Sequence, residues 1–399
     1  MDKTVVELFA GVGGFRVGLN DSNSNWNFVM ANQWEPSRKT QDAFNCYISH
    51  YGDLDIHINE DINKIDKNTI PNHTLLVGGF PCQDYSVAAT QAQGIQGKKG
   101  VLWWDIYEII KAKNPPFVIL ENVDRLLKSP SSQRGRDFGI ILACFAEQGY
   151  CVEWRVINAA EYGFPQRRRR TFIFAFKNTT NYFNHMSNFS LEAWTHKEGF
   201  FQREFPATPK GNVNLGEFNV GNILDVSNNF KFEFLNSGTM HSGHIFTSDT
   251  AANYEGPYKT LADILEENVA ESYYLGNNLD DWQYMKGAKK IERVSKTGHK
   301  YVFAEGPIAF PDPIEKAART MLTSEASKNR STHIIKDPNT NRLRKLTPLE
   351  CERLNGFPDN WTNTGMSERF RYFCMGNALV VGLVTKMGNA LNDIIQKEP

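Results

Sequence analysis

The segment Leu75-Leu76-Val77-Gly78-Gly79-Phe80-Pro81-Cys82-Gln83 places a thiol directly after a proline, behind an apolar run. The apolar residues predict a buried strand, and the Gly-Gly pair ends it, because glycine adopts turns that other residues resist. Pro81 then fixes one backbone dihedral and removes one hydrogen-bond donor. Most cysteines are buried and inert, but α/β sheets carry their chemistry at the ends of strands. We therefore expect Cys82 to be functional.

The composition is that of an ordinary soluble globular protein. The chain has 399 residues, 41% hydrophobic and 22% charged, which is enough for two domains or one large α/β domain with an insertion. Residues 1–4 lead straight into an apolar strand without a signal-peptide pattern, and no apolar run approaches the roughly 20 residues of a membrane helix. The six cysteines form no C-x-x-C pair, which argues against a zinc site or disulfides. This pattern predicts a protein of the reducing cytoplasm.

Positive charge is concentrated in two segments, although the formal net charge is only −1. Residues 286–300 contain six basic side chains and one acidic side chain, and residues 328–345 also contain six and one. Such segments are either solvated faces or sites that contact the phosphates of a polyanion.

Strands and helices alternate through the first 178 residues. We expect strands at 5–9, 28–31, 75–79, 117–120, 152–157 and 171–176, and helices at 102–111 and 138–148. This alternation predicts an α/β fold with a mainly parallel sheet and helices on both faces.

The sequence changes character after about residue 178. Asn, Ser, Gly and aromatic residues dominate, which predicts a second, irregular domain over about 180–340 with one helix-like segment at 259–270. Helical patterns return at Thr347-Pro348, where Thr is a cap and Pro stands in the first turn, and the last helix is expected at 379–395.

A glycine-rich turn, residues 10–14, follows the first predicted strand. Such a turn lets a ligand approach the backbone closely, but the spacing is not G-x-G-x-x-G, so it predicts a nucleoside-type ligand without specifying a dinucleotide. The end of the second strand often offers a carboxylate to ribose hydroxyls, and here both Gln33 and Glu35 are candidates.

An acid and a thiol are expected at the same edge of the sheet. Glu121 follows the strand at 117–120, and the carboxyl ends of parallel strands share one edge, so it can meet Cys82 there. A thiol beside an acid without a nearby His is not a protease arrangement. It suits conjugate addition to a heteroaromatic ring, and the arginine-rich run 166–170 suits binding of an anion or orientation of the thiolate and carboxylate.

Six motifs stand in a fixed order along the chain. They are Phe9-Ala10-Gly11-Val12-Gly13-Gly14, Gly79-Phe80-Pro81-Cys82-Gln83, Glu121-Asn122-Val123, Gln166-x-Arg168-x-Arg170, Arg344-Lys345-Leu346-Thr347-Pro348-Leu349-Glu350 and Gly376-Asn377-Ala378-Leu379-Val380. In this order the chain resembles the DNA (cytosine-5) methyltransferases. The compact length resembles the bacterial restriction–modification type, and only about 180–340 lacks the resemblance.

The resemblance implies a fold, a cofactor and a substrate. It implies a Rossmann-like methyltransferase domain over 1–178, a smaller target-recognition domain over 179–340, and a C-terminal segment, 341–399, that returns to the catalytic domain. The implied cofactor is S-adenosyl-L-methionine, with S-adenosyl-L-homocysteine as product and no metal. The implied partner is double-stranded DNA, bound by a monomer in the bacterial cytoplasm and at the nucleoid, with a cognate restriction endonuclease as a functional partner and no membrane.

The resemblance also assigns residues. The catalytic residues would be Cys82, Glu121, Arg168 and Arg170. The cofactor-binding residues would be Phe9, Ala10, Gly11, Val12, Gly13, Gly14, Gln33, Trp34, Asp61, Ile62, Pro81, Leu102, Asn377 and Leu379. The DNA-binding residues would be Gln83, Ser86, Gln166, Arg168, Thr320, Thr323 and Arg330.

Several of these residues have an ordinary structural interpretation as well. Asp61 could be only a helix cap, Asn377 only a cap of the last helix, and Phe9 and Leu102 only core residues. Gln33 departs from the family, which usually has an acidic residue there; it can bind ribose hydroxyls, but without charge assistance.

The implied reaction begins with attack of the Cys82 thiolate on carbon 6 of cytosine, which makes carbon 5 nucleophilic. Arg168 would favour the negative charge, and Glu121 would contact ring nitrogen 3 and the exocyclic amine. The base must leave the duplex to be reached, and residues 86–100 have the composition of a closing loop. Two alternatives are an RNA (tRNA) cytosine-5 methyltransferase on the same scaffold and a catalytically silent DNA-binding relative.

Overall fold

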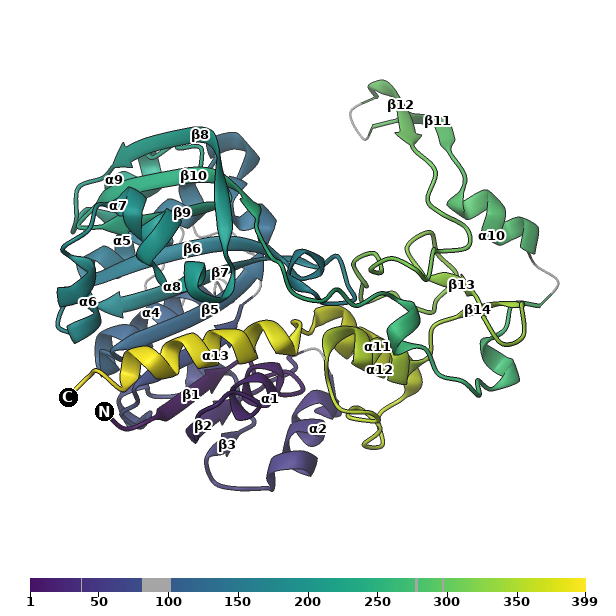
Figure 1. The fold of residues 1–399 in the computed structure, drawn as a ribbon, viewed down its shortest axis with the longest axis horizontal. Coiled ribbons are helices and arrows are strands. Elements are labelled where there is room, and N and C mark those ends of the chain that lie inside the picture. The colour runs from purple at the N-terminus through teal and green to yellow at the C-terminus, as the bar shows by residue number, and fades with distance from the viewer. Residues whose placement is uncertain (37, 81–101, 277–278, 296–297) are drawn as a thin grey trace. The chain divides into compact units, whose positions relative to one another are not determined.

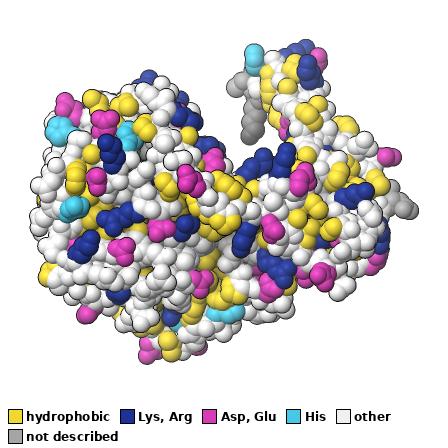
Figure 2. Space-filling model, in the orientation of Figure 1, with side chains coloured by type: hydrophobic (Ala, Val, Ile, Leu, Met, Phe, Trp, Pro, Cys, Tyr) yellow, Lys and Arg dark blue, Asp and Glu magenta, His cyan; other side chains and the backbone are white. Residues whose placement is uncertain are grey.

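A computed structural model describes residues 1–36, 38–80, 102–276, 279–295 and 298–399 (Figure 1). The chain forms two compact units. Unit 1 comprises Met1–Tyr162, Arg169–Gly256 and Val381–Pro399, and unit 2 comprises Gly163–Arg168 and Pro257–Val380. Basic and acidic side chains are interspersed on the face seen in Figure 2, in keeping with the formal net charge of −1.

Unit 1 is built on a ten-stranded sheet. In spatial order its strands are β3 (His57–Ile58), β2 (Asn27–Asn32), β1 (Thr4–Leu8), β4 (Leu75–Gly79), β5 (Phe117–Val123), β7 (Arg169–Lys177), β6 (Tyr150–Asn158), β9 (Ser237–His241), β10 (His244–Ala252) and β8 (Ala207–Glu217). The strands from β3 to β5 pair in parallel, and those from β7 to β8 continue the sheet by antiparallel pairing. The α/β fold class and the six predicted strands are confirmed.

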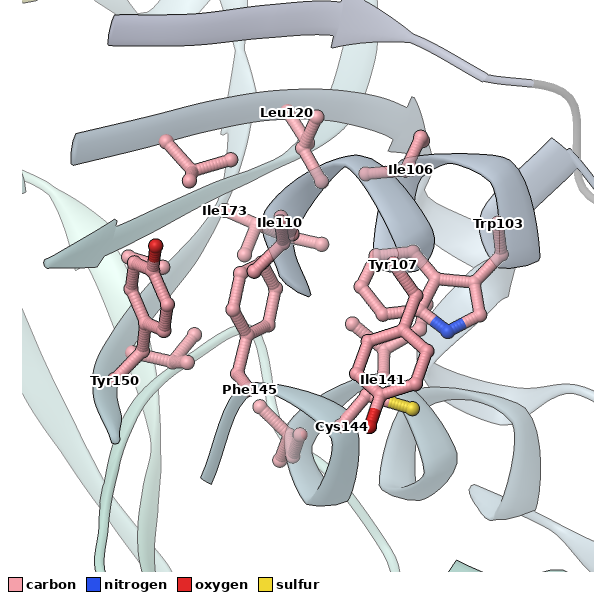
Figure 3. Packing of buried hydrophobic residues seen from close by; sticks show 14 of the residues in the cluster. Trp103, Ile106, Tyr107, Ile110, Leu120, Ile141, Cys144, Phe145, Tyr150 and Ile173 are labelled. Carbon is pink, nitrogen blue, oxygen red and sulfur yellow. The ribbon is translucent and has the colours of Figure 1, made fainter. Parts of the chain in front are cut away.

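Helices cover this sheet. They are α1 (Gly14–Asn20), α2 (Asp42–Tyr51), α4 (Leu102–Lys113), α5 (Arg136–Glu147), α6 (Asn181–Met186), α7 (Leu191–Ala193), α8 (Phe200–Glu204), α9 (Ile223–Asn229) and α13 (Val381–Ile395). The main core lies where α4 and α5 pack on the strands, and Figure 3 shows Trp103 of α4 beside Cys144 of α5, with Phe145 and Tyr150 nearby. The C-terminal helix α13 packs on α1 so closely that a Cβ at Gly18 would lie 2.6 Å from Val384 Cβ.

Unit 2 has little regular structure. It contains α10 (Leu279–Lys286), β11 (Lys289–Val294), β12 (Lys300–Glu305), β13 (Ile334–Lys336), β14 (Leu343–Lys345), α11 (Pro348–Asn355) and α12 (Glu368–Asn377). Unit 2 contains a fully buried ion-pair cluster, in which Arg344 lies 2.6 Å from Asp337 and 2.7 Å from Glu350. Thr347 caps α11 and Pro348 begins it, as the sequence predicts.

Residues 179–256 are more regular than the sequence predicts. They supply strands β8, β9 and β10 and several short helices, and by compactness they belong to unit 1, so the unit boundary falls after Gly256 and not after residue 178. Residues 341–380 group with unit 2, and only residues 381–399 group with the sheet.

The prediction of a helix-like segment at 259–270 is wrong. The structure has a single 3₁₀ turn there, η8 (Ala262–Ile264). The backbone amides of Leu261 and Ala262 donate to the carbonyls of Lys316 and Ile314, at 2.9 and 2.8 Å. Pairing with a distant segment therefore replaces the hydrogen bonds that a helix would have made.

The last helix begins at Val381 and not at residue 379, so Asn377 ends α12 and does not cap α13. Among the described residues no single helix is long and apolar enough to cross a membrane, and α12 with α13 passes that test only as a bent pair counted together.

Candidate catalytic and ligand-binding site

The turn after β1 has an unusual backbone. Phe9, Gly11 and Gly13 have φ values of 54°, 56° and 92°. The left-handed region is strained for a bulky residue such as Phe9, and such outliers gather at functional sites. No atom of the described residues would lie within 4 Å of a Cβ at Gly11, which leaves room for a ligand to approach this turn. The backbone therefore fits the expected role of residues 9–14.

Gln33 holds this turn against the end of β2. Its side-chain Oε1 accepts a hydrogen bond of 2.7 Å from the backbone N–H of Gly11. Its backbone carbonyl accepts one of 2.8 Å from the Asn59 amide. The neighbouring Trp34 side chain is 37% exposed. Gln33 is thus at the glycine-rich turn, as predicted, although the bond to Gly11 gives it a positioning role that the sequence did not indicate.

Glu35, the alternative to Gln33, makes its contacts with α2 and Arg38. Its Oε2 accepts a hydrogen bond of 2.8 Å from the Ala43 N–H in the first turn of α2, and its Oε1 lies 3.6 Å from the Arg38 guanidinium. Burial raises the pKa of this carboxyl. The arrangement favours Gln33 over Glu35 as the residue that faces a ligand at the turn.

A buried polar group supports the turn from behind. Glu7 accepts a hydrogen bond of 2.9 Å from the Tyr47 hydroxyl, and Arg16 donates to the same hydroxyl at 3.0 Å. A Cβ at Gly13 would lie 3.2 Å from the Tyr51 ring and 3.3 Å from the Tyr47 ring. The rings and the turn therefore pack in contact, and the φ of 92° at Gly13 would strain any other residue there.

Glu7 was not among the predicted site residues. Burial raises the pKa of its carboxyl to about 7, although Tyr47 and Arg16 oppose that shift. The signal was present in the sequence, because a carboxylate interrupts the apolar strand Val5-Val6-Glu7-Leu8. A buried charge of this kind requires partners, which Tyr47 and Arg16 supply.

The other predicted cofactor residues have mixed surroundings. Asp61 caps the 3₁₀ turn η1 (Ile62–Lys64), accepting a hydrogen bond of 3.1 Å from the Asn63 N–H. Ile62 and Val12 are buried, and Leu102 packs partly buried against the main core. In unit 2, Asn377 is exposed at the end of α12 and Leu379 is buried.

Glu121 lies beside the end of β4. It is in register with Gly79 on the neighbouring parallel strand, and a Cβ at Gly79 would lie 3.1 Å from Glu121 Oε2. Glycine at this position therefore leaves room for the carboxylate. Glu121 therefore lies beside the end of β4, and its expected meeting with Cys82 stays a prediction because Cys82 lies outside the described residues.

Arg170 forms an ion pair with Glu121. Its Nε lies 2.7 Å from Glu121 Oε1, and the two side chains are only 16% and 12% exposed. Antiparallel pairing of β7 with β5 brings them together, because Arg170 is in register with Val123. The predicted grouping of Glu121 with an arginine of the 166–170 run is thus present in the structure.

Asn122 connects this edge to the segment that precedes Cys82. Its side-chain amide donates a hydrogen bond of 2.8 Å to the backbone carbonyl of Phe80. Both residues are buried, and Phe80 packs 5.9 Å from the ring of Trp103. Asn122 was part of a motif but was not predicted as a site residue. The predicted residues Pro81, Cys82, Gln83 and Ser86, and the segment 86–100, lie outside the described residues.

Arg168 and Gln166 are buried within unit 2. Arg168 donates to the carbonyls of Met321 and Gly376, at 3.2 and 2.8 Å. The Gln166 amide donates to Asn355 Oδ1 at 2.9 Å, and its Oε1 accepts from the Met321 N–H at 3.0 Å. Both side chains thus position neighbouring backbone. This geometry supports indirect roles more strongly than the direct DNA contact expected of them.

The predicted threonines lie near this pair. Thr320 donates a hydrogen bond of 2.5 Å to the Arg167 carbonyl, and Thr323 is exposed. The backbone approach is close here, since a Cβ at Gly376 would lie 2.3 Å from the Thr323 nitrogen. Residues 320–323 are therefore held in a defined conformation by residues 166–168 and by α12.

No group of three or more His, Cys, Asp or Glu side chains able to hold a metal ion occurs in the part of the chain that the structure describes.

Known proteins match nearly the whole chain. The family model described as C-5 cytosine-specific DNA methylase matches residues 3–393. The Type II methyltransferase M.Sau3AI of Staphylococcus aureus is 51% identical over 98% of this chain and 95% of its own length. The Type II methyltransferase M.SsoII of Shigella sonnei is 28% identical over 97% of this chain and 79% of its own length.

Solved structures share the fold at low identity. The Entamoeba histolytica methyltransferase EhMeth has a TM-score of 0.60 and 15% identity, and it covers 99% of each chain. The S. pombe Dnmt2 methyltransferase has a TM-score of 0.61 and 16% identity over 98% of this chain and 99% of its own. These likenesses show the methyltransferase fold alone.

Proposed function

The chain belongs to the family of C-5 cytosine-specific DNA methylases, and from this premise we propose how its residues methylate cytosine in duplex DNA. The proposed reaction uses S-adenosylmethionine, takes place on a cytosine flipped out of the duplex, and passes through a covalent adduct with Cys82. The observation that carries the proposal is the Glu121 carboxylate, packed over Gly79 and paired with Arg170 at the strand end that leads to Cys82.

Cys82 is the proposed nucleophile. An unperturbed thiol has a pKa of about 8.5, so only a minority is thiolate at neutral pH. The thiolate adds to carbon 6 of the cytosine ring, which breaks aromaticity and makes carbon 5 nucleophilic. After methylation of carbon 5, loss of its proton and departure of the thiolate restore the aromatic ring.

Glu121 is proposed to bind the ring nitrogen 3 and the exocyclic amine of the flipped cytosine. A carboxyl group in this position can donate or accept a proton while charge develops on the ring. Arg170 supports it electrostatically, because its guanidinium lies beside Oε1 while Oε2 lies on the side of Gly79. Asn122 then keeps the chain before Cys82 next to this carboxylate.

The glycine-rich turn fits the expected cofactor. S-adenosylmethionine supplies an electrophilic methyl group when bound. Residues 9–14 would hold it, because the positive φ angles and the open space at Gly11 allow close approach to the backbone. Gln33 fixes the turn, and Trp34, Asp61 and Leu102 are proposed as further contacts.

The recognition of DNA is assigned to residues 179–340, as the resemblance implies. Within this range, residues 257–340 belong to unit 2 and contain Thr320 and Thr323. The enzyme is proposed to act as a monomer, with a restriction endonuclease of the same specificity as its functional counterpart.

A methyl-transfer assay tests the proposal against its alternatives. Purified enzyme with labelled S-adenosylmethionine should label duplex DNA and leave tRNA unlabelled, and bisulfite sequencing of DNA from a host that expresses the chain should reveal one methylated sequence. Labelling of tRNA alone would establish the RNA alternative. Binding of DNA without any transfer would establish the silent relative.

A further inference from the structure

The hairpin formed by β11 and β12 pairs with no other strand of the described chain. It is a two-stranded sheet of its own (Figure 1). Most of its side chains are exposed and none is buried. Val294 and Val302 are 63% and 59% exposed, and Tyr301 is 43% exposed. An isolated hairpin is marginally stable in water, so this one adds little to the stability of unit 2. Its exposure calls for a functional explanation.

Positive charge dominates the described part of the hairpin. Its strands carry the cations Lys289, Lys290, Arg293 and Lys300. They carry only two carboxylates, and one of these, Glu305, lies 3.5 Å from the Arg330 guanidinium. Figure 2 shows basic side chains together with hydrophobic ones over this hairpin. The surface is therefore complementary to a polyanion.

The strand register distributes these cations over both faces. Lys290 and Val294 lie on one face with Lys300, whereas Lys289 and Arg293 lie on the other. The exposed apolar residues are divided in the same way, since Val302 faces the first side and Tyr301 the second. The second face also carries Ile291 opposite Phe303, and the Arg293 guanidinium lies 4.0 Å from the Phe303 ring, so cations and apolar side chains are mixed on that face. A two-stranded ribbon with cations on both faces fits a groove of duplex DNA, whose major groove admits such a ribbon.

Arg330 fixes the base of the hairpin. Its guanidinium donates to the carbonyls of Met285 and Gly287 before β11, at 3.2 and 3.1 Å, and to the carbonyl of Gly306 after β12. One side chain thus ties together the two ends of the hairpin. These bonds occupy the guanidinium that the sequence predicted would contact DNA.

We infer that the β11–β12 hairpin is an arm that grips the phosphate backbone of duplex DNA, and that Arg330 is a positioning residue for this arm. The inference rests on the proposed function for the identity of the polyanion. The arm supplies affinity that is independent of sequence, because its exposed cations are mostly lysines, which bind phosphate as point charges. Base reading is left to other parts of the protein.

Salt dependence of binding tests the arm in the full-length protein without cofactor. The triple variant Lys289→Gln, Lys290→Gln, Lys300→Gln should lower the slope of log K against log salt by about 2–3, since each phosphate contact contributes about 0.9. Fluorescence anisotropy with a labelled duplex measures the slope, and affinity should fall by the same factor for cognate and unrelated duplexes. A matched triple variant at exposed lysines of unit 1, Lys210, Lys231 and Lys397 to Gln, should leave the slope unchanged. A slope equal to that of the wild type in the first triple variant would overturn the inference.

The role of Arg330 is tested by whether its replacement weakens binding to all DNA sequences equally. Arg330→Gln should weaken binding to all duplexes alike and reduce the salt slope, and Arg330→Lys should restore part of both. Loss of discrimination at a single base pair, with the slope unchanged, would instead make Arg330 a base reader and overturn its positioning role. Because these experiments measure binding, a wild-type protein that binds DNA without methylating it would refute the proposed function and still decide the role of the arm.

Discussion

The side-chain amide of Asn122 lies 2.8 Å from the backbone carbonyl of Phe80 and donates a hydrogen bond to it. This bond joins the motif that contains Glu121 to the chain just before Cys82. The proposed acid and the proposed nucleophile are thus linked through neighbouring strand ends, because Asn122 follows Glu121 on β5 and Phe80 follows the last residue of β4.

Replacement of Asn122 should lower both activity and stability. Asn122→Ala removes this hydrogen bond, which costs about 0.5–1.5 kcal/mol of unfolding free energy. We expect turnover to fall at least tenfold because the approach to Cys82 is no longer fixed. Asn72→Ala, at an exposed asparagine, is the control for both measurements. Wild-type turnover in Asn122→Ala would show that the bond is only structural.

Replacement of Glu121 should slow the chemical step. Glu121→Gln is expected to reduce the single-turnover rate by roughly 10²–10⁴, the range of a general acid or base, while duplex affinity stays within a few-fold. Asp124→Asn is a matched control, because Asp124 pairs with Arg169 in an exposed ion pair at 3.3 Å. That change should alter the rate little. Equal rates for Glu121→Gln and the wild type would make Glu121 a structural residue.

Gln33 should control affinity for the cofactor. Gln33→Ala removes the acceptor of the Gly11 N–H and should raise the dissociation constant of S-adenosylmethionine about tenfold, as expected for a bond of roughly 1–1.5 kcal/mol. Gln33→Glu keeps an acceptor and should bind at least as tightly as the wild type. Calorimetric titration measures both constants. Unchanged binding by Gln33→Ala would remove Gln33 from the site.

Glu7 should make stability depend on pH. Its pKa is raised from 4.5 to about 7 by burial, so its contribution is complete below about pH 4.5 and is lost as pH rises through about 7. Glu7→Gln cannot ionise. Relative to the variant, the wild type should therefore lose roughly 2–3 kcal/mol between pH 5 and pH 8. Denaturant unfolding of both proteins at both pH values measures this loss. If the stability of the wild type relative to the variant were the same at pH 5 and at pH 8, the raised pKa of Glu7 would be contradicted.

The sequence predicted the parallel part of the fold well. Apolar runs such as residues 75–77 and 117–120 read as buried strands because both of their faces are covered. Strand β8 of the antiparallel extension was missed because it is mostly exposed and its composition resembles that of a loop. Strands β9 and β10 were missed although they are largely buried, because Ser, Thr and Gly make up much of their sequence. The hairpin of β11 and β12 was seen only as a basic segment, since its strands lack a buried face.

The candidate site was predicted in part. The grouping of Glu121 with an arginine follows from strand ends that share an edge, and the structure contains it as the pair with Arg170. The surroundings of Arg168 and Gln166 could not be predicted, because they depend on contacts with residues 321, 355 and 376, which are far away in the sequence. The roles of Cys82 as nucleophile and of residues 179–340 in recognition stay predictions.

Trapping of the enzyme on a modified duplex tests the central claim most directly. A duplex with 5-fluorocytosine at the target should form a covalent adduct with the wild-type enzyme in the presence of S-adenosylmethionine, because fluorine at carbon 5 cannot leave as a proton does. Cys82→Ser should form no adduct and should keep cofactor binding, since a hydroxyl is a far weaker nucleophile near neutral pH. A denaturing gel separates adduct from free protein, and peptide mapping should place the DNA on Cys82. An active wild-type enzyme that forms no adduct, or a Cys82→Ser enzyme that keeps more than a few per cent of turnover, would contradict the covalent mechanism.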